Sequence, residues 1–166
     1  MKNKLGVSPV IATILLVGLA VVLIGVVWTI VNNLVQDQTQ QASACFGVLD
    51  KVILNEKYTC YYKAESILQV SIDIRNVDVE SLLVSIEGQD STKTFELSNT
   101  SLVREGVYNA EGTQDNVVMP KKNGGKNYLL DATFGIEIPP RTIKISPKIK
   151  GYQCEVSSTM TQIGEC

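Results

Sequence analysis

The feature that most constrains this chain is a long stretch without charge near its N-terminus. Residues 7–31 read VSPVIATILLVGLAVVLIGVVWTIV, in which sixteen residues are Val, Ile or Leu, and residues 5–36 carry no charged side chain. As a helix, residues 7–31 rise about 38 Å, which exceeds the hydrocarbon thickness of a membrane, about 30 Å. The stretch therefore predicts a helix that spans a membrane or packs against copies of itself.

The charges around this stretch predict its orientation. Lys2 and Lys4 are the only charges before Asp37, and positive residues favour the cytoplasmic side. The N-terminus is therefore expected in the cytoplasm and the remainder of the chain outside, with Trp28 near the outer interface. A removable signal peptide is disfavoured because its apolar region is about half as long.

The helix is expected to continue beyond the membrane to about residue 44. Apolar side chains recur at three- and four-residue steps through a Gln-rich background, which predicts a narrow apolar stripe packed on the outer domain. Pro9 suits the helix start, where its missing N–H costs nothing. The residues of the stripe are Trp28, Val31, Leu34, Val35, Gln38, Ala42 and Cys45.

The string KLGVSPVIATILLV, Lys4 to Val17, resembles the N-terminal signature of archaeal type IV pilins, over about the first 35 residues. The resemblance implies that a prepilin peptidase cuts between Gly6 and Val7 and that the apolar segment then packs into a filament core. Two positions depart from related patterns. Leu5 stands where the family usually has a charged residue, and Ile11 stands where bacterial type IV pilins carry a glutamate, so hydrophobic packing alone would set assembly.

These observations predict a basic leader at 1–6, an assembly helix at 7–44 and an extracellular β-rich domain at 45–166. Gly18 and Gly25 lie seven residues apart, on one helix face, and would allow close approach of helices, although no GxxxG pair is present. The residues expected to serve assembly are Val10, Ile14, Gly18, Gly25 and Trp28.

The outer segment changes to a two-residue period, which is typical of half-buried strands. Turn residues separate the runs at 76–78, 88–91, 123–125 and 139–140. We therefore expect an α+β fold, with an antiparallel sheet or small sandwich of roughly six to eight strands after the helix. Residues 105–127 are expected to form a long exposed loop. The alternating runs fall at 68–74, 82–86, 95–97, 130–138 and 143–145, and residues 48–54 form a first strand or the last helical turn.

Four cysteines, Cys45, Cys60, Cys154 and Cys166, all follow the apolar stretch. An even number in an exported domain favours disulfides, and no C-x-x-C pair suggests zinc. Of the three connectivities, the spacing favours two local loops, Cys45–Cys60 and Cys154–Cys166. Each would contribute roughly 3 kcal/mol through chain entropy.

The remaining residues argue against catalysis and nucleic-acid binding. Removing Lys2 and Lys4 from 15 basic residues leaves 13 against 17 acidic ones, a net charge of −4 for residues 37–166. There is no histidine, no phosphate-binding glycine motif and no recognisable metal or cofactor site. Asn99-Thr100-Ser101 is the one N-x-S/T sequon and makes Asn99 a candidate glycosylation site.

Two functions remain open from the sequence. The first is a structural subunit of a surface filament, whose partners are related pilin subunits, the prepilin peptidase and the membrane. A minor component that primes or caps such a filament is a variant of it. The second is a single-pass membrane anchor that carries an extracellular binding domain and does not polymerise.

Overall fold

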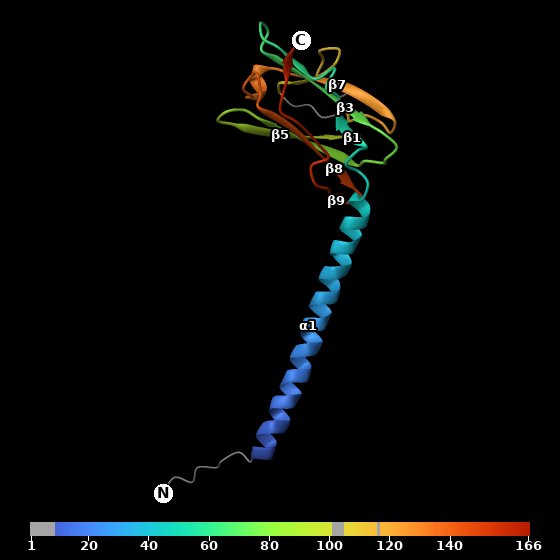
Figure 1. Ribbon diagram of the computed structural model, residues 1–166, viewed down its shortest axis with the longest axis vertical. Coiled ribbons are helices and arrows are strands. Elements are labelled where there is room, and N and C mark those ends of the chain that lie inside the picture. The colour runs from blue at the N-terminus through green and yellow to red at the C-terminus, as the bar shows by residue number, and fades with distance from the viewer. Residues whose placement is uncertain (1–8, 101–104, 116) are drawn as a thin grey trace. The chain divides into compact units, whose positions relative to one another are not determined.

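A computed structural model describes residues 9–100, 105–115 and 117–166 of the chain (Figure 1). The chain divides into two compact units between Gln40 and Gln41, and each is described separately. The proposed leader and the cut between Gly6 and Val7 lie outside the described residues.

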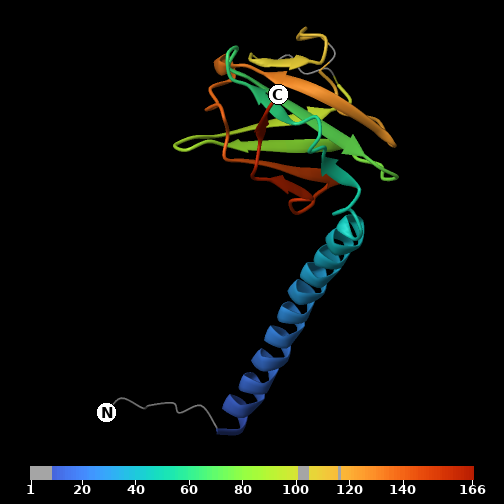
Figure 2. The same cartoon turned by 45° about the horizontal axis from the view of Figure 1, so that its top comes forward.

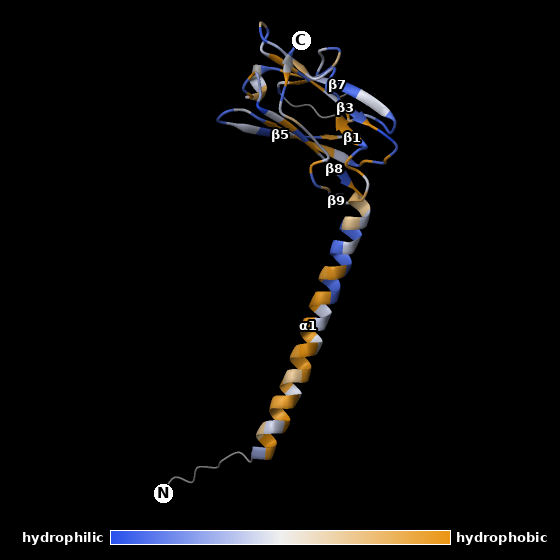
Figure 3. Cartoon of the chain, in the orientation of Figure 1, coloured by the Kyte–Doolittle hydropathy of each residue, from blue (hydrophilic) through white to orange (hydrophobic). Residues whose placement is uncertain are grey.

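One helix, α1, runs from Pro9 to Cys45. Pro9 occupies its first turn, where a missing backbone N–H breaks no intrahelical bond. Gly47, with φ of +71°, follows the last turn in the left-handed conformation that commonly ends a helix. Hydrophobic residues dominate most of α1, and the strongly hydrophilic ones gather in its C-terminal part (Figure 3). The helix ends one residue beyond its predicted end.

Two β-sheets follow the helix, in layers that face each other (Figure 2). The first sheet has the order β11-β2-β3-β7-β6, with β1 also paired to β3. The second has the order β10-β8-β4-β5, with β9 also paired to β8. The strands are β1 Val52–Leu54, β2 Cys60–Tyr62, β3 Ile67–Ile74, β4 Ser81–Glu87, β5 Thr92–Ser98, β6 Val107–Asn109, β7 Gly124–Leu130, β8 Thr142–Ile149, β9 Tyr152–Gln153, β10 Ser158–Met160 and β11 Gly164–Glu165.

The core lies between the sheets and is built by the alternation visible in the sequence. Every second residue of β8 is buried, and Val84 of β4 pairs with Phe95 on one side and Ile145 on the other. The ring of Phe95 meets that of Phe134 edge to face, with 5.5 Å between centroids. The expected α+β class is thus confirmed, and the runs at 68–74, 82–86, 95–97 and 143–145 all lie within strands. One pair, β2 with β11, is parallel.

The predicted strand at 130–138 is wrong beyond its first residue. After Leu130 the chain enters a 3-10 turn, η1 Ala132–Phe134. The carboxylate of Asp131 accepts the Thr133 backbone N–H at 2.8 Å, and the Phe134 N–H donates to the Asp131 carbonyl at 3.2 Å. These local bonds compete with the sheet ladder. Phe134 and Ile136 are nevertheless buried, so the alternation indicated burial but not strand.

The predicted exposed loop at 105–127 is also wrong in part. It contains β6 and the first residues of β7, and Val107, Val117 and Met119 are buried. Gly124 and Gly125, expected in a turn, pair instead with Ile74 and Asp73 of β3. A Cβ on Gly125 would overlap Oδ1 of Asp73, whose other carboxylate oxygen accepts a hydrogen bond from Asn55. This glycine therefore marks a close approach within a sheet.

We expect Gly125→Ala to destabilise the protein by about 1–3 kcal/mol, because the added methyl displaces the Asp73 carboxylate from Asn55. Denaturant unfolding of the full chain in detergent measures the change. Gly164→Ala is the matched control, since that strand glycine has open space around it and should cost far less. Equal losses for both variants would contradict the steric explanation.

Asp131 predicts an acid-dependent loss of stability. Burial raises the pKa of its carboxyl, but hydrogen bonds from Thr133 and Tyr108 outweigh this effect and hold the pKa below its usual value. A carboxyl with a lowered pKa in the folded state stabilises the fold above its unfolded pKa, about 3.9, and loses that contribution as the pH falls through the folded pKa. When the pH is lowered below 4, the melting temperature should therefore fall less in Asp131→Asn than in the wild type. Thermal unfolding at a series of pH values measures both.

Candidate assembly helix

The helix α1 presents an apolar surface that its own chain leaves open. None of its residues is buried, and Val10, Ile14 and Trp28 are 65–67% exposed. By length and composition this helix could cross a membrane. Burying apolar surface gains about 25 cal/mol per Å², so water is a poor surrounding for such a helix. Its stable surroundings are lipid or other apolar helices.

The five residues expected to serve assembly share one face of this helix. At 100° per residue, Val10, Ile14, Gly18, Gly25 and Trp28 fall within an arc of about 80°. Beyond the adjoining backbone of the helix itself, a Cβ added to Gly18 or Gly25 would meet no atom within 4 Å. The face therefore has two shallow places flanked by larger apolar side chains, which suits close packing of a neighbouring helix.

The hydroxyl groups within the apolar part of α1 are satisfied by the helix itself. Thr13 donates to the carbonyl of Val10 at 2.8 Å, and Thr29 donates to that of Gly25 at 3.0 Å. Thr39, further along, does the same to Val35. Such back-bonding lets a threonine enter an apolar environment without an unpaired donor. These threonines are not among the residues predicted to serve assembly, although their position inside an apolar helix is a usable signal.

The predicted apolar stripe ends at Cys45, which packs against the core of the outer domain. Trp28, Val31, Leu34 and Val35 belong to the other compact unit, and their packing on the outer domain stays a prediction.

The predicted local disulfides are also wrong. Cys45 bonds to Cys154 and Cys60 bonds to Cys166, with Cα–Cα distances of 5.4 and 5.2 Å. The cause is strand pairing between distant segments. Strand β11 lies parallel to β2, and the Cys166 N–H donates to the carbonyl of Tyr61 at 3.0 Å, which places Cys166 beside Cys60.

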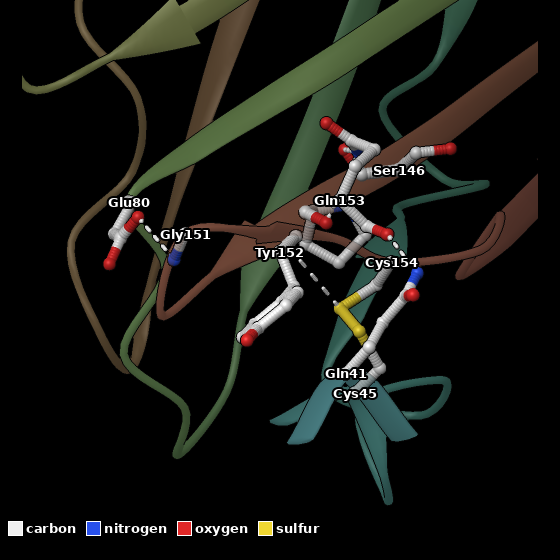
Figure 4. The surroundings of a disulfide bond; sticks show 9 residues. Gln41, Cys45, Glu80, Ser146, Gly151, Tyr152, Gln153 and Cys154 are labelled. Atoms are coloured by element: carbon white, nitrogen blue, oxygen red, sulfur yellow. Dashed lines mark hydrogen bonds between the residues drawn. A yellow bond between two sulfur atoms is a disulfide. The ribbon is translucent and has the colours of Figure 1, made fainter. Parts of the chain in front are cut away.

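The hairpin of β8 and β9 brings Cys154 to the last turn of α1 (Figure 4). Its two-residue turn has positive φ at both Lys150 and Gly151, as a tight hairpin requires. The Gly151 N–H donates to the Glu80 carboxylate at 3.0 Å, and the Cys154 N–H donates to the Pro147 carbonyl at 2.9 Å. These bonds hold the backbone on both sides of the β9 strand.

Gln153 and Gln41 complete this attachment. The amide of Gln153 donates to the carbonyls of Ser146 and Pro147, at 3.1 and 3.2 Å. The carbonyl of Gln153 accepts a hydrogen bond from Gln41 at 3.4 Å. Gln41 and Cys45 are four residues apart and so share a helix face. The Cys45–Cys154 disulfide and the Gln41–Gln153 hydrogen bond therefore fix the last turn of α1 to the hairpin.

Asn99 lies exposed in the turn after β5, and Ser101 of its sequon lies outside the described residues. Within the described part of the chain, no group of three or more His, Cys, Asp or Glu side chains is placed to hold a metal ion.

Residues 5–46 match the family model described as archaeal type IV pilin, N-terminal. The match confirms the resemblance seen at Lys4 to Val17 and extends through all of α1. No curated protein and no solved structure matches the chain. The apolar helix and this N-terminal match together support a pilin-like subunit, and the matched family is structural rather than catalytic.

Removing the Cys45–Cys154 bond by Cys45→Ser/Cys154→Ser should lower the free energy of unfolding by roughly 2–5 kcal/mol, since the bond closes a loop of about a hundred residues. Denaturant unfolding in detergent measures the loss. Cys60→Ser/Cys166→Ser removes a loop of similar length and should cost a similar amount. Non-reduced peptide mapping that joins Cys45 to Cys60 would contradict the connectivity.

Proposed function

We propose that this chain is a structural subunit of a type IV pilus-like surface filament, assembled through α1 and displaying the β-domain. One observation carries the proposal: the segment that matches archaeal type IV pilins contains a helix that is apolar and uncharged from Pro9 to Gln36 and has no buried residue. A polymer of such helices removes that surface from water.

Before assembly, the helix anchors the subunit in the membrane, with the N-terminus in the cytoplasm and the β-domain outside. Lys2 and Lys4 support this orientation through the excess of positive charge on the cytoplasmic side. The two disulfides support an extracellular β-domain, because such bonds persist in oxidising surroundings. A prepilin peptidase then cuts between Gly6 and Val7, which makes Val7 the new N-terminus.

Assembly depends on the helix face that carries Gly18 and Gly25. With Ile11 in place of an acidic residue, no charge pair in the helix core sets the register of neighbouring subunits. The register is then set by the fit between the surfaces of neighbouring helices, and the two glycines let a neighbouring backbone approach closely. Dispersion contacts along the interface supply the attraction.

The alternative is a membrane-anchored binding domain that does not polymerise. Leu5, which occupies the position before Gly6 where the family usually has a charged residue, favours this alternative. Mass spectrometry of the native protein decides whether the mature chain begins at Val7 or Met1. Electron microscopy of surface preparations labelled with an antibody to the β-domain decides whether a filament contains it. A chain that begins at Met1 and labels no filament would overturn the proposal.

Gly18→Leu and Gly25→Leu should each reduce filament yield at least about tenfold, because the larger side chain separates the packed helices. Sedimentation of sheared filaments, normalised to the subunit in the membrane fraction, measures the yield. Ala20→Leu adds comparable bulk on the opposite face of α1 and should preserve most of the yield. Equal yields for all three variants and the wild type would contradict the assigned face.

A further inference from the structure

The two disulfides connect the same pair of segments, one at the start of the β-domain and one at its end. The first segment, residues 45–60, carries Cys45 and Cys60, and the second, residues 154–166, carries Cys154 and Cys166. The two segments and two bonds form a closed covalent ring. The chain between them, residues 61–153, leaves the ring at Cys60 and returns to it at Cys154.

This connectivity has a topological consequence for any break in the backbone. A cut within 61–153 leaves two fragments that remain joined through both disulfides. A cut between Cys45 and Cys60 leaves the β-domain joined to α1 through Cys45–Cys154. A cut between Cys154 and Cys166 leaves the last residues joined through Cys60–Cys166. No single cut from Cys45 to Cys166 therefore releases a fragment. With the local pairs Cys45–Cys60 and Cys154–Cys166, by contrast, any cut within 61–153 would separate the chain into two unconnected fragments.

Exposed connections make such cuts realistic. Gln89 and Asp90 lie exposed between β4 and β5, Lys121 and Lys122 lie exposed before β7, and the connection between β1 and β2 is exposed near Glu56. Exposed, polar connections are the preferred sites of proteolytic nicking. The segments that flank the Glu56 connection remain paired after a cut, because β1 and β2 both bond to β3.

We propose that the crossed disulfides are a retention device, which keeps the β-domain attached to its apolar helix after an extracellular protease has nicked it. Cys45–Cys154 is the bond on which attachment depends, since it alone bridges a cut between the helix and the remainder of the domain. The device requires only that α1 is held in an apolar surrounding, so it does not depend on polymerisation.

The test inserts the recognition sequence of a site-specific endopeptidase between Glu56 and Lys57 of the full chain, reconstituted in lipid vesicles. After cleavage, the two fragments should migrate as one species on a denaturing gel without reductant and separate when reductant is added. In Cys45→Ser/Cys154→Ser, the β-domain fragment should separate almost completely without reductant. In the matched control Cys60→Ser/Cys166→Ser, the fragments should stay joined.

Folding of the serine variants is not needed for the decisive comparison, because the wild-type disulfides can be reduced after cleavage. Release of the β-domain from vesicles sedimented in denaturant, which separates β1 from β3, should then rise from near zero to a large fraction only when cleavage and reduction are combined. Separation of the cleaved wild-type fragments without reductant would overturn the proposal. So would fragments that remain covalently joined in Cys45→Ser/Cys154→Ser.

Discussion

The structure depends on one constraint: the surface of α1 cannot remain in water. From Pro9 to Gln36 the helix carries no charge, and its own chain buries none of it. Hydrophobic free energy scales with area, so a long helix of this kind gains far more from being covered than any single contact in the β-domain contributes. The subunit is therefore incomplete alone, and its stable states are those in which lipid or other helices surround α1.

The β-domain meets the opposite requirement, because it must hold together without help from the apolar part of the helix. Its two sheets enclose a shared core, and the Leu54 N–H of the first sheet donates to the Ser158 hydroxyl of the second at 3.1 Å. Disulfides bind the two ends of the domain to one another. The apolar part of α1 thus needs lipid or other helices around it, whereas the β-domain has a core of its own.

The elements that could be predicted are those whose signal is local. A helix follows from an uncharged apolar run, and β3, β4, β5 and β8 follow from two-residue alternation. The predictions were wrong where pairing with a segment distant in the sequence determines the local structure. The pair Gly124-Gly125 is typical of a turn, but in the structure it pairs with Asp73 and Ile74 of β3. Cys166 is close to Cys154 in sequence, but the pairing of β11 with β2 places it beside Cys60. At the candidate site, Val10, Ile14, Gly18, Gly25 and Trp28 could be named from sequence, since helix periodicity alone places them on one face.

The threonine back-bonds in α1 bear on how a subunit could exchange between surroundings. Because Thr13 and Thr29 already donate within the helix, neither hydroxyl needs a partner from lipid or from a neighbouring subunit. Moving such a helix from a bilayer into a bundle of like helices breaks and makes no hydrogen bond at these positions. The two apolar surroundings then differ for α1 mainly in shape fit. A change of apolar surroundings therefore leaves the hydrogen bonds of Thr13 and Thr29 intact.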